Sequence, residues 1–122
     1  MQFTETRRDD GITVLNLHGR LDIEGSEEVG LRLTTATTGD NVRVIADLAG
    51  VDFMSSIGIG VLVRIAHSVR RRGGNMVLLD PQPVVKLILE KTQIPRIITM
   101  HETLDEAVAA VMLPPLIPSQ TS

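Results

Sequence analysis

The fold of this chain is decided by one stretch, Val51-Asp52-Phe53-Met54-Ser55-Ser56-Ile57-Gly58-Ile59-Gly60. This stretch joins the end of a strand-like run to the start of a helix-like run, so a small hydroxyl stands at the helix N-terminus. The first turn of a helix has unpaired backbone N–H groups and the positive end of the helix dipole. Such a turn can hold a serine oxygen, or a phosphate placed on it, and it therefore suggests a switch.

The helix expected after this junction covers residues 57–72. At about 100° per residue one face is apolar and is expected to pack inward; it holds Val61, Leu62, Ile65, Ala66 and Val69. The opposite arc holds Gly60, Val63, Arg64, His67 and Arg71. One turn further back this arc includes Ser56, whereas Ser55 leans toward the buried side. We therefore expect Ser56 to be the exposed serine.

Two glycines, Gly58 and Gly60, follow these serines. Glycine inside a helix costs about 1 kcal/mol relative to alanine. Both positions are understandable if another surface approaches the helix closely, so we expect a docking partner there. The plainer interpretation of Ser55 and Ser56 is that one of them only caps the helix, which contributes about 1 kcal/mol.

Hydrophobic periodicity and turn residues predict an alternation of strands and helices along the chain. Asp9-Asp10-Gly11 is a tight-turn sequence that joins the first two strands in a hairpin. Ser26 is available as the N-cap of the first helix, and Thr103 with Glu106 forms a capping-box pattern before the last one. The expected strands are 3–8, 12–18, 42–48, 76–79 and 97–100, and the expected helices are 26–37, 57–72, 83–91 and a final one from 104.

Length and composition restrict the class of protein. The 122 residues suit one domain, and 43% hydrophobic residues are too many for a disordered chain. No apolar run approaches the ~20 residues that cross a bilayer, and the N-terminus does not resemble a secretory signal. We therefore expect a cytoplasmic protein with no direct membrane insertion. A net charge of −3, with no tryptophan or tyrosine, disfavours nucleic acid as a partner.

The sequence predicts no catalytic, cofactor-binding or metal-binding residues, so we expect a binding module rather than an enzyme. Cysteine is absent, and His18, His67 and His101 lack the spacing of metal ligands. Asp22, Asp47 and Asp52 all lie near expected strand ends, which is the arrangement of an acidic pocket for Mg²⁺ or for phosphate transfer. Turn and cap chemistry is the plainer role for these aspartates.

The last ten residues, 113–122, contain Pro114, Pro115 and Pro118 among small polar residues. This composition predicts a flexible tail after the folded domain.

The junction from Phe53 to Leu62 resembles the signature of STAS domains, the anti-sigma factor antagonist family. Residues 15–22 look like the family's strand ending in Gly-x-Leu-Asp, and Gly73-Gly74 falls where the family has a glycine before its next strand. The likeness covers about residues 3–112. It implies an α/β fold with a single STAS domain at residues 1–112, which has a mixed central sheet of four to five strands, an N-terminal hairpin and about four flanking helices.

The resemblance implies a bacterial partner-switching protein. In this family the antagonist binds an anti-sigma factor of the histidine-kinase-like ATPase type and frees the sigma factor. That anti-sigma factor is a serine kinase which phosphorylates the antagonist at the start of the long helix, and a PP2C-type phosphatase reverses the reaction. By motif match the phosphoacceptor is Ser56. Ser55 stands where the commonest family pattern has aspartate, and it is the rival acceptor.

The resemblance also assigns the loop after the second strand to the partner surface. Together with the junction and the exposed arc of the helix, the expected partner-binding residues are Asp22, Ile23, Glu24, Ser56, Gly58, Gly60, Val63, Arg64 and His67. Two alternatives stay open. The first is a STAS scaffold that docks on a transporter ATPase or another complex without phosphorylation, and the second is a small-molecule or nucleotide sensor that uses the same helix N-terminus.

Overall fold

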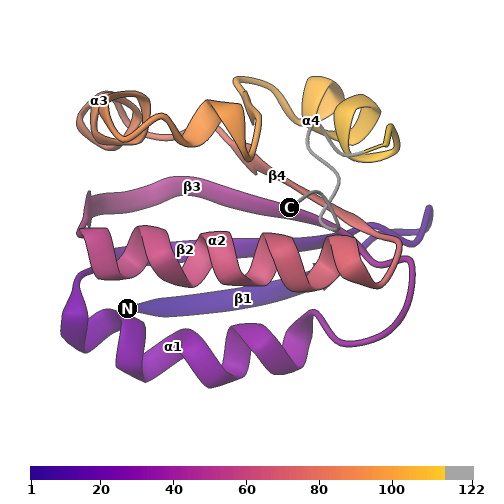
Figure 1. Ribbon diagram of the computed structural model, residues 1–122, viewed down its shortest axis with the longest axis horizontal. Coiled ribbons are helices and arrows are strands. Elements are labelled where there is room, and N and C mark those ends of the chain that lie inside the picture. Colours follow the sequence, from indigo (N-terminus) through magenta and orange to yellow (C-terminus); the bar gives the residue numbers. More distant parts are fainter. Residues whose placement is uncertain (115–122) are drawn as a thin grey trace.

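In the computed structural model, which describes residues 1–114, a five-stranded sheet carries helices on both faces (Figure 1). The strands lie in the order β1-β2-β3-β4-β5, so each strand is a neighbour of the one before it in the sequence. The elements are β1 (Gln2–Arg7), β2 (Thr13–Leu21), α1 (Ile23–Ala36), β3 (Arg43–Met54), α2 (Ser56–Arg71), β4 (Asn75–Leu79), α3 (Pro83–Lys91), η1 (Ile94–Arg96), β5 (Met100–His101) and α4 (Leu104–Val111).

The predicted N-terminal hairpin is confirmed. Strands β1 and β2 pair antiparallel, from Gln2 opposite His18 to Arg7 opposite Thr13. Gly11 closes the turn with a φ of 86°, a conformation that glycine adopts without a steric penalty. The remaining pairs, β2 with β3, β3 with β4 and β4 with β5, are parallel, which makes the sheet mixed.

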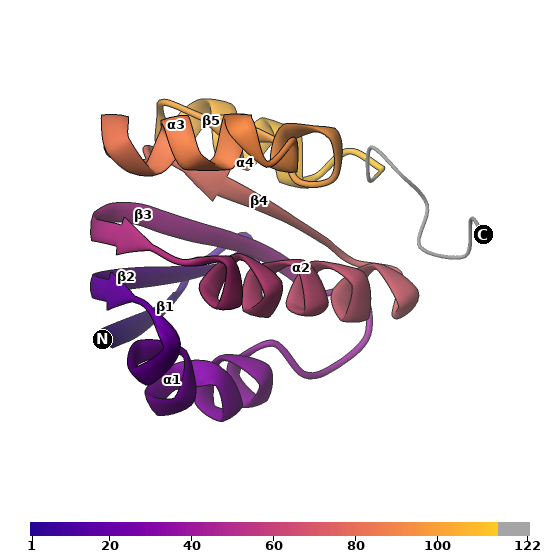
Figure 2. The same ribbon diagram turned by 60° about the vertical axis from the view of Figure 1, so that its left-hand side comes forward.

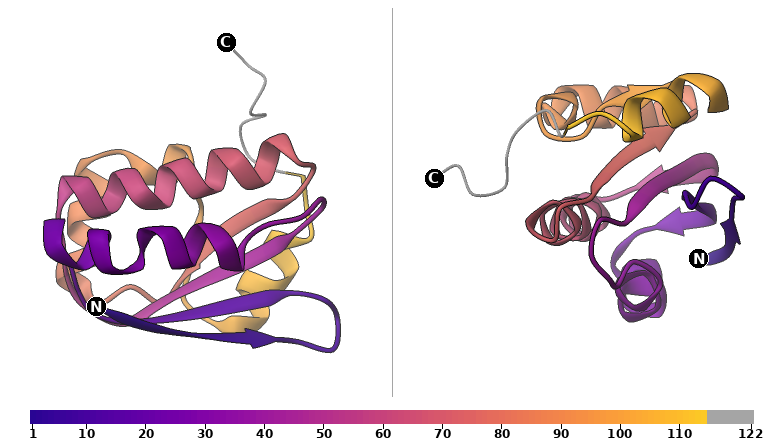
Figure 3. Two further views of the ribbon diagram at one scale, coloured as in Figure 1. Left: turned by 90° about the horizontal axis from the view of Figure 1, so that it is seen from below. Right: turned by 90° about the vertical axis from the view of Figure 1, so that its right-hand side faces the viewer.

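Alternate residues of the central strand β3 point to opposite faces of the sheet, and each face has its own hydrophobic core. On one face, Val44 and Ala46 pack with buried residues of α1, α2 and α3. On the other face, Ile45 packs with Ala107 and Val111 of α4. Figure 3 shows α1 and α2 on one side of the sheet and α4 on the other. The inward face predicted for the long helix, from Val61 to Val69, is buried as expected.

Three predicted elements differ from the structure. Strand β3 runs on to Met54, because the pairing with β2 continues past the small residues Ala49 and Gly50. Helix α1 begins at Ile23, so the prediction of Ser26 as its N-cap is wrong; Asp22 is the cap. The last strand was expected at 97–100 but is the two-residue β5, because Ile97 follows directly on the 3₁₀ turn η1.

The long helix α2 begins at Ser56 and is capped by Ser55. Thr103 caps α4 by accepting a hydrogen bond from the Glu106 N–H, as the capping-box pattern predicts. None of the helices described within residues 1–114 is long and apolar enough to cross a bilayer. Most of the predicted flexible tail, 115–122, lies outside the described residues.

Candidate functional site

Two helix N-termini meet at one edge of the sheet. Strands β2 and β3 are parallel neighbours that end in register, with Leu21 opposite Met54. Directly after these residues the chain turns into a helix on each strand, and Asp22 and Ser55 are the two N-caps. In Figure 2 the starts of α1 and α2 lie on the same side of the molecule as the ends of β2 and β3. The predicted loop residues and the predicted serines are therefore brought together.

Ser55 is fixed in place by three hydrogen bonds. Its backbone N–H donates to the Leu21 carbonyl oxygen over 3.0 Å, and its hydroxyl Oγ lies 3.2 Å from the same oxygen. The hydroxyl also accepts a hydrogen bond of 3.2 Å from the Gly58 N–H, which satisfies a donor in the first turn of α2. Ser55 is half-buried, and these bonds tie the start of α2 to the end of β2.

Ser56 is exposed, as the helical projection predicts. Among the described residues its side chain has no hydrogen-bond partner. The first turn of α2 contains no acidic residue, so no resident carboxylate competes there for the positive end of the helix dipole. Chemically, this is a free primary hydroxyl at a helix N-terminus.

The two glycines of the junction have different surroundings. A Cβ on Gly58 would overlap the Leu21 carbonyl oxygen and lie 2.7 Å from the Leu21 Cγ, so Gly58 is needed for packing inside the molecule. Burial against β2 therefore explains this glycine without a partner, and the contact of Gly58 with a partner stays a prediction. At Gly60 a Cβ would meet only the Arg64 Nη1 atom, at 3.8 Å. No internal contact explains Gly60, which remains a position for an approaching partner.

Asp22 holds the start of α1. Its Oδ1 atom accepts a hydrogen bond of 2.8 Å from the Gly25 N–H, and its Oδ2 atom lies 3.4 Å from the Arg20 Nε. The hydrogen bond from Gly25, assisted by the Arg20 guanidinium, lowers the pKa of the Asp22 carboxyl below its ordinary value of 3.8. Arg20 in turn stacks over the Phe53 ring of β3, with its Cζ 4.3 Å from the ring centre. The side chain of Asp22 is thus committed to capping, although it is partly exposed.

Exposed apolar side chains lie beside both caps. Ile23, the first residue of α1, has 61% of its surface exposed, and Ile57, the second residue of α2, has 50% exposed. Ile23 is among the residues predicted to contact a partner, whereas Ile57 is not. The sequence contains a signal for the exposure of Ile57, because this residue falls outside the buried arc of the helical projection. Glu24 and Arg64 are also exposed, while Val63 and His67 are half-buried, so these predicted partner residues are accessible.

The acidic pocket considered from the sequence does not form. Asp47 caps a local turn by accepting a hydrogen bond from the Ala49 N–H, and Asp52 is exposed on β3. Within residues 1–114 no group of three or more histidine, aspartate or glutamate side chains could hold a metal ion. His18 packs across Gly50, and the Nε2 atom of His101 lies 2.8 Å from the Thr99 Oγ1.

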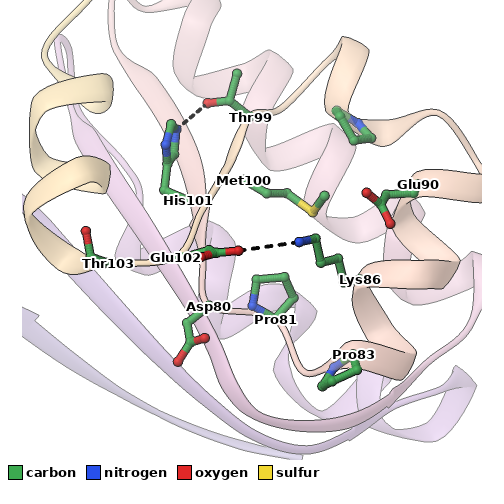
Figure 4. A pocket seen from close by; sticks show the side chains of 11 residues that line it. Asp80, Pro81, Pro83, Lys86, Glu90, Thr99, Met100, His101, Glu102 and Thr103 are labelled. Atoms are coloured by element: carbon green, nitrogen blue, oxygen red, sulfur yellow. Dashed lines mark hydrogen bonds and ion pairs between the residues drawn. The ribbon is translucent and has the colours of Figure 1, made fainter.

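A separate cavity of about 990 Å³ lies beyond the ends of β4 and β5, between α3 and the start of α4 (Figure 4). Several of its polar side chains interact with one another. Lys86 forms an ion pair of 3.6 Å with Glu102, and His101 bonds to Thr99. The junction serines do not line it.

Several known proteins resemble this chain in sequence and in fold. A Mycobacterium tuberculosis protein with the provisional name anti-anti-sigma factor is 30% identical over 103 residues, which cover 81% of this chain and 70% of the relative. The crystal structure of a provisionally named anti-sigma factor antagonist from Thermotoga maritima superposes with a TM-score of 0.81 at 26% identity, covering 91% of this chain and 95% of that one.

The anti-sigma factor antagonist SpoIIAA is similar in two forms. Its unphosphorylated form matches with a TM-score of 0.72 at 25% identity, covering 91% of this chain and 96% of that one. The phosphorylated form, from Bacillus, matches with a TM-score of 0.68 at 23% identity, covering 90% and 99%, and this likeness shows the fold alone. The family model of the STAS domain matches residues 4–107, which include both caps and the whole of α2. This chain therefore belongs to the STAS domain family.

Proposed function

We propose that this protein is an anti-sigma factor antagonist of a bacterial partner-switching system, acting in the cytoplasm. In its unmodified form it binds an anti-sigma factor of the histidine-kinase-like ATPase type and thereby releases a sigma factor. The anti-sigma factor is also the serine kinase that phosphorylates Ser56 and ends the interaction, and a PP2C-type phosphatase restores binding. The names of the relatives support the general role, and the environment of Ser56 supports the switch.

The observation that carries this proposal is the exposed Ser56 hydroxyl at the start of α2, next in sequence to the exposed Ile57, with the exposed Ile23 at the start of α1 on the same sheet edge. An apolar surface of this kind is suited to a protein partner. Because Ser56 directly precedes Ile57, a modification of its hydroxyl would change the surface that the partner contacts.

The effect of a phosphate follows from its charge. It adds about −1.5 to −2 charges and three acceptor oxygens. The protein itself tolerates this charge, because the N-terminus of α2 has no acidic residue in its first turn. At a docked interface the same charge must be desolvated against the partner, and each 1.4 kcal/mol of cost lowers affinity about tenfold.

The surroundings of the two serines favour Ser56 over Ser55 as the acceptor. The Ser55 hydroxyl is half-buried and engaged with Gly58 and Leu21, so a phosphate on it would break the N-cap. Ser55 also takes the place of the aspartate in the commonest family pattern, and it supplies the capping oxygen that this position requires.

The test compares the wild type with Ser56→Ala and Ser56→Asp. Each protein is immobilised and exposed to lysate of the source organism with ADP present, and the retained proteins are identified by mass spectrometry. We expect wild type and Ser56→Ala to retain a histidine-kinase-like ATPase and Ser56→Asp to lose it, with an affinity at least tenfold lower. Incubating the isolated pair with ATP and mapping the phosphopeptide should then identify Ser56.

A second candidate is the scaffold that docks without phosphorylation, and the replacement of the usual aspartate by Ser55 favours it. Retention of one transporter component by all three proteins would support the scaffold and contradict the switch. A phosphate mapped to Ser55 would keep the switch but move its position.

A further inference from the structure

A groove of about 660 Å³ runs between α1 and α2, and neither Ser55 nor Ser56 lines it. Helix α1 contributes hydroxyl, acidic and small side chains, and α2 contributes basic ones. The residues of its lining that the following argument uses are Ser26, Glu27, Arg64, His67, Ser68 and Arg71. Arg64 and His67 also belong to the partner surface proposed above, whereas Ser26 and Arg71 do not.

The α2 wall of this groove is basic. Arg64 and Arg71 are seven residues apart, which places them on one side of the helix about 10 Å apart along its axis, and His67 lies between them. Neither arginine forms an ion pair or a side-chain hydrogen bond within residues 1–114. Glu27 is the one acidic residue of the lining. The groove therefore presents two guanidinium groups, each with free donors.

Ser26 in the α1 wall provides a second, independent indication. It is 5% exposed, and its hydroxyl Oγ has no hydrogen-bond partner among the described residues. Burying a hydroxyl group is energetically unfavourable when it loses its hydrogen bonds to water and gains none within the protein. An acceptor oxygen reaching the floor of the groove would satisfy it.

We propose that this groove binds a small, elongated anion with a phosphate or carboxylate group toward each end. Guanidinium groups bind both kinds of oxygen anion through paired N–H donors. The spacing of Arg64 and Arg71 selects a molecule with two separated anionic groups. Ser26 lies in the first turn of α1, toward the Arg64 end of the groove, and its hydroxyl donates to an oxygen of the anionic group bound at that end. This inference does not depend on the phosphorylation of Ser56.

The test is a titration of the isolated, ¹⁵N-labelled protein followed by amide chemical shifts. The probes are fructose 1,6-bisphosphate, the dicarboxylate suberate, and inorganic phosphate, all at constant ionic strength because exposed charges are screened by salt. We expect saturable shifts at Gly30, Thr34 and Ser68 with at least one of the two dianions, and affinity at least tenfold weaker for inorganic phosphate. The stronger dianion identifies phosphate or carboxylate as the preferred group.

Arg71→Gln is the decisive variant, since it removes one guanidinium and leaves the partner surface intact. We expect it to weaken dianion binding about tenfold, the loss typical of one charge-assisted contact. Lys91→Gln, an exposed cation on α3, is the charge-matched control and should bind within twofold of wild type. Ser26→Ala should bind more weakly while remaining folded. Equal affinities of Arg71→Gln and Lys91→Gln, or no saturable shift in the groove, would overturn the proposal whatever Ser56 does.

Discussion

Ser55 and Ser56 are adjacent in the sequence but differ in what surrounds them. The Ser55 hydroxyl is shared between the Gly58 N–H and the Leu21 carbonyl, and the Ser56 hydroxyl is open to solvent. One serine is therefore structural and the other is available for chemistry. The helical projection was sufficient to separate them, because the first residue of a helix already follows its periodicity.

Replacing each serine by alanine should show this difference in stability. We expect Ser55→Ala to lower the free energy of unfolding by about 1 kcal/mol, the usual cost of a lost N-cap. Ser56→Ala should change it by less than about 0.5 kcal/mol, as is normal for an exposed site. Urea denaturation of both variants measures the two values, and equal losses would contradict the assignment of Ser55 as the cap.

Gly58 and Gly60 form a matched pair for the next prediction. Gly58→Ala should destabilise the protein by about 1–3 kcal/mol, because the added methyl group overlaps the Leu21 carbonyl. Gly60→Ala should stabilise it by up to about 1 kcal/mol, since alanine is the better helix former and its methyl group meets open space. Thermal unfolding of both variants is the measurement. A stable Gly58→Ala protein would refute the packing role of Gly58.

The partner surface has its own test at Gly60. Gly60→Arg should keep the melting temperature close to that of wild type and lose the anti-sigma factor captured by the wild-type protein, because the large side chain projects from the exposed arc of α2. Calorimetric titration with the isolated partner measures the loss. Unchanged affinity would remove this arc of the helix from the interface.

At the scale of the elements, the two helices that begin at the sheet edge were predicted with unequal success. Helix α2 was placed within one residue, since its apolar spacing is regular from Val61 to Val69. Helix α1 was predicted to start three residues late. Gly25, in the first turn of α1, is a poor helix former and weakened the helical pattern of the sequence. The structure needs glycine at this position because a Cβ would overlap the Arg20 carbonyl oxygen. The tight approach of strand and helix that requires this glycine is a tertiary feature, which periodicity does not report.

The cap of α1 predicts a pH dependence. The pKa of Asp22 is lower in the folded protein than its ordinary value of 3.8, so the unfolded chain takes up the proton first as the pH falls. The charged cap therefore adds stability above pH 3.8 and loses that contribution as the pH drops through the folded pKa. Asp22→Asn keeps a capping oxygen but carries no charge.

The measurement is the difference in melting temperature between wild type and Asp22→Asn as a function of pH. We expect wild type to be the more stable at neutral pH and the difference to shrink below pH 3.8. The effect should be small, because Asp22 is solvent-accessible. A difference that grows on acidification would contradict the lowered pKa.

At the scale of the whole molecule, the hairpin, the mixed sheet and the succession of strands and helices were predicted, whereas the full strand order was not. The nearly continuous apolar run from Val42 to Leu48 is typical of a strand covered on both faces and predicts a central strand; the strand it forms, β3, is flanked by β2 and β4. The groove between α1 and α2 was not found, because Ser26 and Arg71 come from helices whose relative position the sequence does not give. The burial of Ser26 was not predicted either, because Ser26 was expected to be the N-cap of α1.

Hydrogen exchange should report this layering. Amides of β3, which is paired on both sides and covered on both faces, should exchange slowest. Amides of the exposed edge strand β1 and of the two-residue β5 should exchange much faster. Mass spectrometry of deuterated fragments gives the order, and rapid exchange in β3 would be inconsistent with its central position.

The sequential strand order also has a consequence for how the protein is made. Every strand pairs with the strand that precedes it in the chain, so a polypeptide leaving the ribosome meets each pairing partner already synthesised. The β1–β2 hairpin can form first, and β3, β4 and β5 can each add to an existing edge in turn. Assembly can thus follow translation from end to end, with α4 arriving last to cover the second face.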